Sequence, residues 1–214
     1  MININYGFAV VQLFVAKRGF FFGFVSAFVV SILVFIGYMT LSEDVANAKK
    51  VNFNMENTLY MDLKDGRVVI RMLPDVAPKH VARIKQLVRE GFYDGLTFHR
   101  VIDNFMAQGG DPLGNGTGGS GVKIPAEFTK KYSHKRGVVS MARASEPNSA
   151  DSQFFICTAD ATYLDGQYTI WGYVVEGMEF VDNIKKGDVI NNGLVDNPDK
   201  IIKMTVAIDT KKKK

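Results

Sequence analysis

An uncharged apolar run of 23 residues divides this 214-residue chain into two parts that must fold in different surroundings. The run covers residues 19–41 and is long enough to cross the hydrocarbon core of a bilayer as a helix. Two basic residues, Lys17 and Arg18, precede it and two acidic residues follow it, an order that predicts a cytoplasmic N-terminus. Residues 49–214 are therefore expected to form a domain on the far side of a membrane.

The small residues Ala46-Asn47-Ala48 follow this run, and their spacing is one that a signal peptidase recognises. The length of the run favours an uncleaved anchor, whereas the small-residue site favours cleavage near Ala48, and the sequence leaves both open. We therefore predict that residues 1–48 are a signal peptide or a membrane anchor. Residues 4–16 are also apolar but too short to span a bilayer, which leaves the true start codon open as well.

The domain after the run must be stabilised by its own core, because the chain has a single cysteine. Cys157 has no partner for a disulfide within the chain, and its apolar neighbours favour a buried strand thiol over a nucleophile. With 47% hydrophobic residues, the chain can form one well-packed domain and an appendage. The net charge of +4 is small, and the lysines at 211–214 form a basic tail without interleaved aromatic residues, so nucleic-acid binding is not expected.

Short apolar runs separated by turn residues dominate the chain after a polar linker at residues 49–57 and predict a mainly β fold. Thr58–Leu63 and Arg67–Leu73 alternate apolar and polar residues on either side of Asp65-Gly66, which is a hairpin pattern. Further strands are expected at Thr97–Ile102, Phe105–Gly109, Val138–Ala142, Gln153–Thr158, Tyr168–Val175 and Ile201–Ile208.

Two segments change to helical periodicity. Four apolar residues spaced three or four apart fall on one face of an early helix, namely Ala77, Val81, Ile84 and Val88. A second helix is expected over Met178–Lys186. Many strands with one early and one late helix predict a closed antiparallel barrel capped by two helices.

Several common catalytic patterns are absent or incomplete in the sequence. A G-x-G-x-x-G spacing occurs at Gly114, Gly116 and Gly119, but no helical pattern follows it, as a dinucleotide site requires. A surface loop is predicted there instead. The three histidines are scattered, which argues against a metal site, and no G-x-S-x-G motif supports hydrolysis. No cofactor and no metal are predicted.

Two runs of sequence combine a cation, amides and aromatic rings. FHRVIDNFMAQGGD at residues 98–111 contains Arg100 and Gln108, and SQFFICT at residues 152–158 contains Gln153 beside an aromatic pair. On composition alone, Arg100 could also be a surface residue of a barrel or half of an ion pair. Together the two runs supply a fixed cation, two amides and an apolar wall without an evident nucleophile, which suits a reaction that twists a bond without breaking it.

Three longer stretches resemble the cyclophilin family of peptidyl-prolyl isomerases, especially its exported bacterial members. They are FHRVIDNFMAQGGDPLGNGTGG, VVSMARASEPNSADSQFFICT and YLDGQYTIWGYVVEGMEFVDNI. The resemblance extends from about Thr58 to Ile208. It implies an eight-stranded antiparallel barrel closed by two helices, which agrees with the architecture expected from periodicity, and a peptidyl-prolyl cis-trans isomerase that needs no cofactor.

The resemblance also assigns roles to individual residues. Arg100 stands at the position of the family's catalytic arginine, and Gln108 and Gln153 stand at the positions of amides that orient substrate and arginine. The other matching positions line the proline pocket and the adjoining peptide groove: Phe105, Met106, Ala142, Phe155, Tyr163, Leu164 and Tyr168.

Three residues depart from the best-known eukaryotic pattern. Tyr163 replaces a tryptophan at the pocket rim, Tyr168 replaces a histidine of the pocket, and Arg143 replaces an asparagine. Because both tyrosines keep an aromatic surface, activity should survive. The loss of an indole N–H at Tyr163 predicts weak binding of cyclosporin, the family's inhibitor.

We therefore predict an isomerase domain over residues 58–210, followed by the basic tail at 211–214. It is expected to be a monomer in the periplasm, either secreted after cleavage or anchored in the inner membrane through residues 19–41. It would accelerate rotation about X-Pro bonds of proline-containing polypeptides and assist the folding of exported proteins. One alternative is a non-catalytic cyclophilin-like chaperone or adaptor, which the retained arginine and glutamines argue against. Another is an inner-membrane structural protein, which accounts only for the apolar run.

Overall fold

In the computed structural model, the described part of the chain is residues 54–213, which belong to one compact unit. The apolar run at 19–41 and the small-residue site near Ala48 lie outside the described residues. Within residues 54–213, no helix has both the length and the apolar character needed to cross a membrane. The end of the predicted linker forms a short 3-10 helix, η1 (Met55–Asn57).

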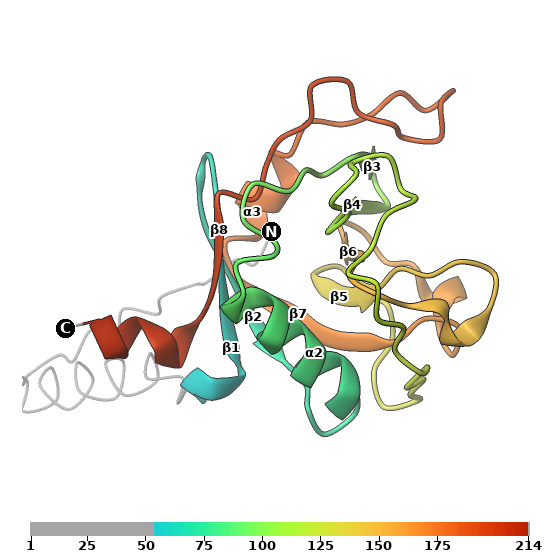
Figure 1. Ribbon diagram of the computed structural model, residues 1–214. Helices are drawn as coiled ribbons and strands as arrows, with labels where there is room; N and C mark the ends of the chain where they lie inside the picture. The colour runs from blue at the N-terminus through green and yellow to red at the C-terminus, as the bar shows by residue number, and fades with distance from the viewer. Residues whose placement is uncertain (1–53, 214) are drawn as a thin grey trace, which may run out of the picture. The chain divides into compact units, whose positions relative to one another are not determined.

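Eight strands form one antiparallel sheet that curls into a half-barrel (Figure 1). Their order across the sheet is β3-β4-β6-β5-β7-β2-β1-β8. The strands are β1 (Thr58–Leu63), β2 (Gly66–Met72), β3 (Arg100–Ile102), β4 (Met106–Gly109), β5 (Val138–Met141), β6 (Phe154–Cys157), β7 (Ile170–Glu176) and β8 (Lys203–Val206). The predicted hairpin is confirmed, because every residue of β1 pairs with a residue of β2.

The sheet is open, so the prediction of a closed barrel was wrong. The edge strands β3 and β8 do not pair with each other. The free edge of β3 bonds instead to the long segment that precedes β8, where Val101 N donates to Gly193 O at 2.8 Å and Gly187 N donates to Val101 O at 2.9 Å. These loop residues occupy backbone groups that a closing strand would need, and β3 is only three residues long.

Two helices lie at opposite ends of the curled sheet, α2 (Pro78–Arg89) and α3 (Met178–Asp182) (Figure 1). The predicted apolar face of α2 is buried in the core. The side chain of its N-cap residue forms no hydrogen bond with the first turn of the helix. The Glu127 carboxylate caps the helix instead, by accepting hydrogen bonds from Lys79 N and His80 N, both at 3.0 Å. A residue far away in sequence therefore anchors the start of α2.

The second helix and the last strand are shorter than their sequence patterns indicate. α3 ends at Asp182 rather than at Lys186, and Lys185 N donates to the Asp199 carboxylate at 2.8 Å, which is incompatible with a continuing helix. The last strand, β8, gives way to a 3-10 helix, η4 (Ala207–Lys213). Two further 3-10 helices, η2 (Pro147–Ser149) and η3 (Thr162–Leu164), lie in the loops beside β6.

Alternate residues of the central strands build two hydrophobic clusters on opposite faces of the sheet. Phe154, Ile156 and Trp171 are fully buried in the larger cluster, and we call this side the core face. Phe155 and Cys157 belong to the smaller cluster on the other side, which we call the pocket face. Since successive side chains of a strand point to opposite faces, β6 is apolar throughout because both of its faces are covered.

Candidate active site

The strand register places three of the predicted site residues in one row on the pocket face. Arg100 lies opposite Gln108 across β3 and β4, and Gln108 lies opposite Phe155 across β4 and β6. Directly opposed residues of antiparallel strands are neighbours on the same face. Pairing between strands therefore brings together side chains that are as far as 55 positions apart in the sequence.

Arg100 is held by neutral groups on two edges of its guanidinium. Nη1 donates to Gln108 Oε1 at 3.1 Å, while Nε and Nη2 donate to the main-chain and side-chain oxygens of Asn192, both at 2.9 Å. Among residues 54–213, no carboxylate forms an ion pair with it. Burial lowers the pKa of the Arg100 guanidinium, but arginine stays cationic in proteins. A fixed and unneutralised positive charge therefore lies at this position.

The two glutamines form a ladder of hydrogen bonds behind the arginine. Gln108 Nε2 donates to Gln153 Oε1 at 2.9 Å, and Gln153 Nε2 donates to the carbonyls of Gly116 and Gly118 at 3.0 and 2.8 Å. These bonds fix which end of each amide is the oxygen, and so point Gln108 Oε1 at Arg100. The glycine-rich loop thus acts as the anchor of the ladder.

A small pocket of about 120 Å³ opens beside the guanidinium. It is lined by eight side chains in addition to Arg100: Phe105, Met106, Gln108, Ala142, Arg143, Phe155, Leu164 and Tyr168. Gln153 lies in a neighbouring hollow of about 180 Å³, together with Ala142 and residues of the glycine-rich loop. The predicted pocket residues therefore converge, with Gln153 set behind Gln108.

Tyr163 lies at the rim and does not line the pocket. Its side chain is 64% exposed, and its ring packs against that of Phe105 with centroids 5.8 Å apart. Tyr168 meets Phe155 edge to face at 5.7 Å and is covered by the Arg143 guanidinium at 4.7 Å. Arg143 is itself fixed by donating from Nε to Gln167 O at 2.9 Å. Arg143, which replaces the asparagine of the eukaryotic pattern, therefore supports Tyr168 in one wall of the pocket.

His134 supports the opposite side of Phe155. The two rings stack with centroids 6.1 Å apart, and His134 Nδ1 lies 2.7 Å from the Asp165 carboxylate at the end of η3. Burial lowers the pKa of His134, against the influence of its bond to Asp165. Leu164, which lines the pocket, directly precedes Asp165. The bond between His134 and Asp165 therefore links the two pocket residues Phe155 and Leu164.

Asn192 is the site residue that sequence reasoning missed. It lies 92 positions from Arg100, and its own backbone has a positive φ of 55°. The sequence did contain one local signal, since the Asn-Gly pair at 192–193 is typical of turns that need this conformation. No local pattern indicates that such a turn meets an arginine on another strand.

Other expectations concern residues that do not line the pocket beside Arg100. Gly114, Gly116 and Gly119 lie in a loop without a helix, as predicted, and the loop wraps around the Asp111 carboxylate. Cys157 is buried, and burial raises the pKa of its thiol to about 12. Within residues 54–213, no group of three His, Cys, Asp or Glu side chains is arranged to hold a metal ion.

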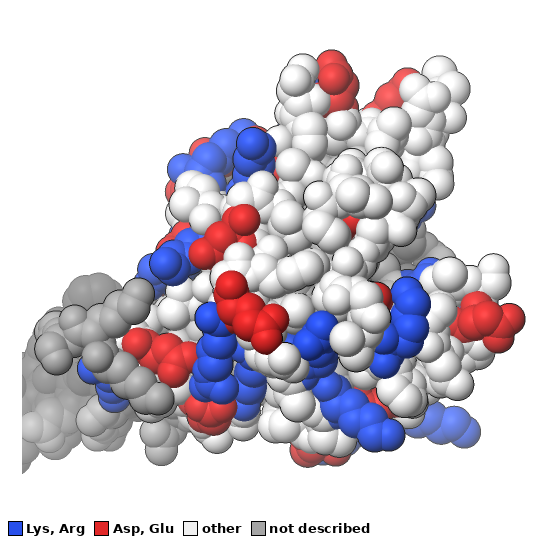
Figure 2. Space-filling view, viewed as in Figure 1, with Lys and Arg blue, Asp and Glu red and all other residues white. Residues whose placement is uncertain are grey.

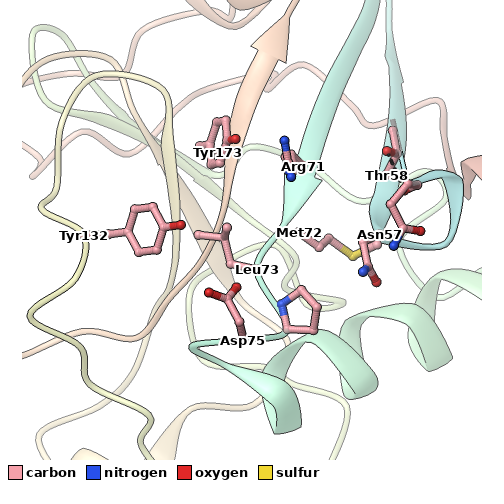
Figure 3. Close-up of a pocket in the computed structure, with 10 residues that line it drawn as sticks. Asn57, Thr58, Arg71, Met72, Leu73, Asp75, Tyr132 and Tyr173 are labelled. Atoms are coloured by element: carbon pink, nitrogen blue, oxygen red, sulfur yellow. Dashed lines mark hydrogen bonds between the residues drawn. The ribbon is translucent and has the colours of Figure 1, made fainter. Parts of the chain in front are cut away.

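A second cavity, of about 350 Å³, shares no residue with the pocket beside Arg100. Figure 3 shows it between the end of β2, the start of α2 and Tyr132. Amides, phenols, Arg71 and Asp75 line it, and Asp75 forms an ion pair with Lys131 at 2.5 Å. It differs from the smaller pocket because a carboxylate, that of Asp75, lies among its polar groups.

Comparisons with known proteins cover most of the described residues. Residues 58–206 match the family described as cyclophilin type peptidyl-prolyl cis-trans isomerase/CLD. A probable peptidyl-prolyl cis-trans isomerase of Brucella suis is 56% identical over 168 residues, which are 73% of this chain and 85% of the relative. Peptidyl-prolyl cis-trans isomerase B of Bacillus subtilis is 44% identical over 135 residues, which are 62% of this chain and 94% of the relative.

Solved structures of the same kind share the fold. A cyclophilin from Hirschia baltica superposes with a TM-score of 0.65 at 27% identity, covering 73% of this chain and 76% of the other. A Cryptosporidium parvum cyclophilin-type isomerase, crystallised in the presence of the dipeptide Ala-Pro, superposes with a TM-score of 0.64 at 28% identity, covering 70% and 98% of the two chains.

Proposed function

This chain belongs to the cyclophilin-type peptidyl-prolyl cis-trans isomerases, and we propose that it isomerises X-Pro bonds at the pocket beside Arg100. One observation carries the assignment of the site. A half-buried guanidinium with only neutral partners borders a pocket with aromatic and aliphatic walls. A proline ring is apolar and fits such walls, while its nitrogen would face the cation.

The chemistry needs a group that favours the twisted amide over the planar one. Rotation about an X-Pro bond breaks amide resonance, with a barrier of about 18–20 kcal/mol, and takes tens to hundreds of seconds without a catalyst. As the bond twists, the proline nitrogen becomes pyramidal and regains a lone pair. The N–H groups of Arg100 that remain beyond its three bonds can donate to that lone pair. This interaction is stronger in the transition state than in the substrate, as catalysis requires.

The arginine supplies only part of the rate enhancement. An acceleration of about five orders of magnitude corresponds to about 7 kcal/mol of barrier. One charge-assisted hydrogen bond contributes about 1.5–3 kcal/mol. The remainder is assigned to the walls, where Phe105, Met106, Phe155 and Leu164 hold the ring and exclude water while the preceding carbonyl rotates. Gln108 and Gln153 keep the guanidinium oriented.

A protease-coupled assay on a short X-Pro peptide tests this proposal, using the full-length chain beside Arg100→Ala. The variant should keep its melting temperature and lose about 10- to 150-fold in kcat/KM, the equivalent of about 1.5–3 kcal/mol. An Arg100→Ala protein with full activity would refute the mechanism. Near-background rates from both folded proteins would favour the non-catalytic binding module instead.

We also propose that the isomerase acts on exported polypeptides in the periplasm. Lys17 and Arg18 lie directly before the apolar run at 19–41, and Glu43 and Asp44 are the first charged residues after it, which supports this orientation. Protease added to spheroplasts should digest the isomerase domain without lysis, and a chain that is digested only after lysis would contradict the proposal. The mass of the mature protein decides between cleavage near Ala48 and an uncleaved anchor.

A further inference from the structure

The segment between α3 and β8 carries exposed apolar side chains that the proposed mechanism does not use. Val189, Ile190 and Leu194 are 76%, 93% and 52% exposed. Figure 1 shows this segment as an excursion that leaves the half-barrel on the side of β3. We call residues 188–194 the apolar loop. Exposed apolar side chains gathered on one loop are typical of contact surfaces.

The apolar loop is compact, because its own backbone closes it. Gly193 N donates to Asp188 O at 2.7 Å, and the Asp188 carboxylate accepts from Ile190 N at 2.9 Å. At the neck, Gly187 touches Gly193, and a Cβ on Gly187 would lie 1.9 Å from Gly193 O. Only glycine fits there. The exposed side chains are therefore presented by a defined turn, which lowers the entropic cost of binding to them.

The apolar loop is also joined directly to Arg100. Asn192, within the loop, accepts two of the three hydrogen bonds of the guanidinium, and Arg100 pairs with Leu194 in an isolated β-bridge. Gln108 occupies a different edge of the guanidinium. No residue of the loop lines the pocket itself, but the loop contacts Arg100, which does, and the placement of Arg100 depends on it.

We propose that the apolar loop is a second substrate-contact surface, which binds an apolar residue that flanks the proline in an extended polypeptide. The inference rests on the proposed function. An extended chain advances about 3.3 Å per residue, so positions within a few residues of a bound proline reach a loop that begins beside Arg100. Valine and isoleucine side chains covered by such a residue lose water-exposed apolar area, which favours binding.

The apolar loop carries little charge, which suits an apolar ligand. The apolar loop contains one charged side chain, that of Asp188, and its carboxylate accepts hydrogen bonds from Ile190 and Asn191 within the loop. Figure 2 shows the projections in this part of the molecule as uncharged surface with acidic groups. A surface with so little charge is suited to an apolar segment. Because folded proteins bury most such residues, the surface selects segments that have not yet folded.

The test uses peptides with one proline that differ in a single flanking position. Leucine or serine is placed two, three or four residues from the proline on either side, and kcat/KM and calorimetric affinity are measured. The full-length chain is compared with the double variant Val189→Ser and Ile190→Ser. Ile202→Ser serves as the matched control, because Ile202 is 59% exposed and bonds to Asp62 on β1.

The wild-type chain should prefer leucine by about fivefold at one or two of these positions, through KM and affinity. The double variant should lose most of that preference, and Ile202→Ser should keep it. A wild-type chain without preference, or a double variant that retains it, would overturn the inference. If turnover is absent while the affinity difference follows the loop, the contact surface stands and the proposed isomerase activity fails.

Discussion

The core face and the pocket face belong to the same strands but are stabilised in different ways. On the core face, Phe154 and Trp171 meet edge to face at 6.0 Å, within a cluster of fully buried side chains. On the pocket face, directional bonds between Arg100, Gln108 and Gln153 fix partly exposed polar groups. Packing tolerates replacements of similar volume, whereas a chain of donors and acceptors tolerates few. Stability and activity should therefore respond to different residues of one strand.

Neighbouring residues of β6 offer the largest expected difference. Ile156→Ala removes a buried side chain from the core face and should cost about 2–5 kcal/mol of unfolding free energy, with kcat/KM per folded molecule little changed. Phe155→Ala opens the pocket wall and should lower kcat/KM about tenfold or more, in addition to some loss of stability. Urea unfolding and the isomerisation assay measure both quantities. Equal losses of activity in the two variants would contradict the division between the faces.

The pH dependence of stability should come from three buried histidines. His80, His99 and His134 are buried, and burial lowers the pKa of all three imidazoles. The nearby carboxylates of Glu127, Asp111 and Asp165 oppose this shift. Below about pH 6.5 the unfolded chain binds protons that the folded chain does not, so stability falls as the pH decreases from there. Each histidine contributes up to about 1.4 kcal/mol per pH unit.

Urea unfolding at pH 5, 6, 7 and 8 measures this slope, and His99→Gln should reduce it. Arg100 stays cationic across the range, so kcat/KM on a neutral peptide is expected to remain flat from pH 6 to pH 8. A stability that is constant or rises below pH 6.5 would show that these imidazoles are protonated in the folded chain.

A smaller effect is expected from the amide ladder. Gln108→Ala removes a bond to Arg100 and a bond to Gln153, and should lower kcat/KM about two- to tenfold with little change in melting temperature. Gln108→Glu keeps an acceptor for Arg100 but adds a carboxylate beside it. If the unneutralised charge matters, Gln108→Glu should be less active than Gln108→Ala, and the reverse order would count against this role.

The smallest expected effect concerns the rim of the pocket. Tyr163 is exposed and lacks the indole N–H of the eukaryotic pattern. Tyr163→Trp should therefore strengthen cyclosporin binding by about two- to tenfold, measured by calorimetry. Tyr163→Phe is the matched control, since it keeps the ring without adding a donor. An unchanged affinity in Tyr163→Trp would mean that the rim does not limit inhibitor binding.

Local pattern predicted much of the sheet and the first helix, because hydrophobic periodicity reports which face is covered. It failed where a distant partner decides the path of the chain. The segment after Asp182 has helical periodicity, yet the Asp199 carboxylate draws Lys185 N away from a helix. The barrel was expected to close, yet the backbone of Gly193 occupies the free edge of β3.

The residues of the site could also be predicted only in part. The motifs that contain Arg100, Gln108 and Phe155 are visible in the sequence, and the register of β3, β4 and β6 brings them together. Asn192 was not found, because its contribution depends on a turn that docks beside another strand. Side chains placed by strand pairing can thus be inferred from motifs, while those placed by loop docking require the structure.

The most direct test of this account is the activity of Arg100→Lys. Lysine keeps the positive charge but cannot reproduce a planar fork held at the same time by Gln108 and Asn192. If the fixed geometry of the guanidinium is what stabilises the twisted amide, kcat/KM of Arg100→Lys should fall to within a few-fold of Arg100→Ala. An Arg100→Lys protein with nearly wild-type activity would show that charge alone suffices, and would contradict the account.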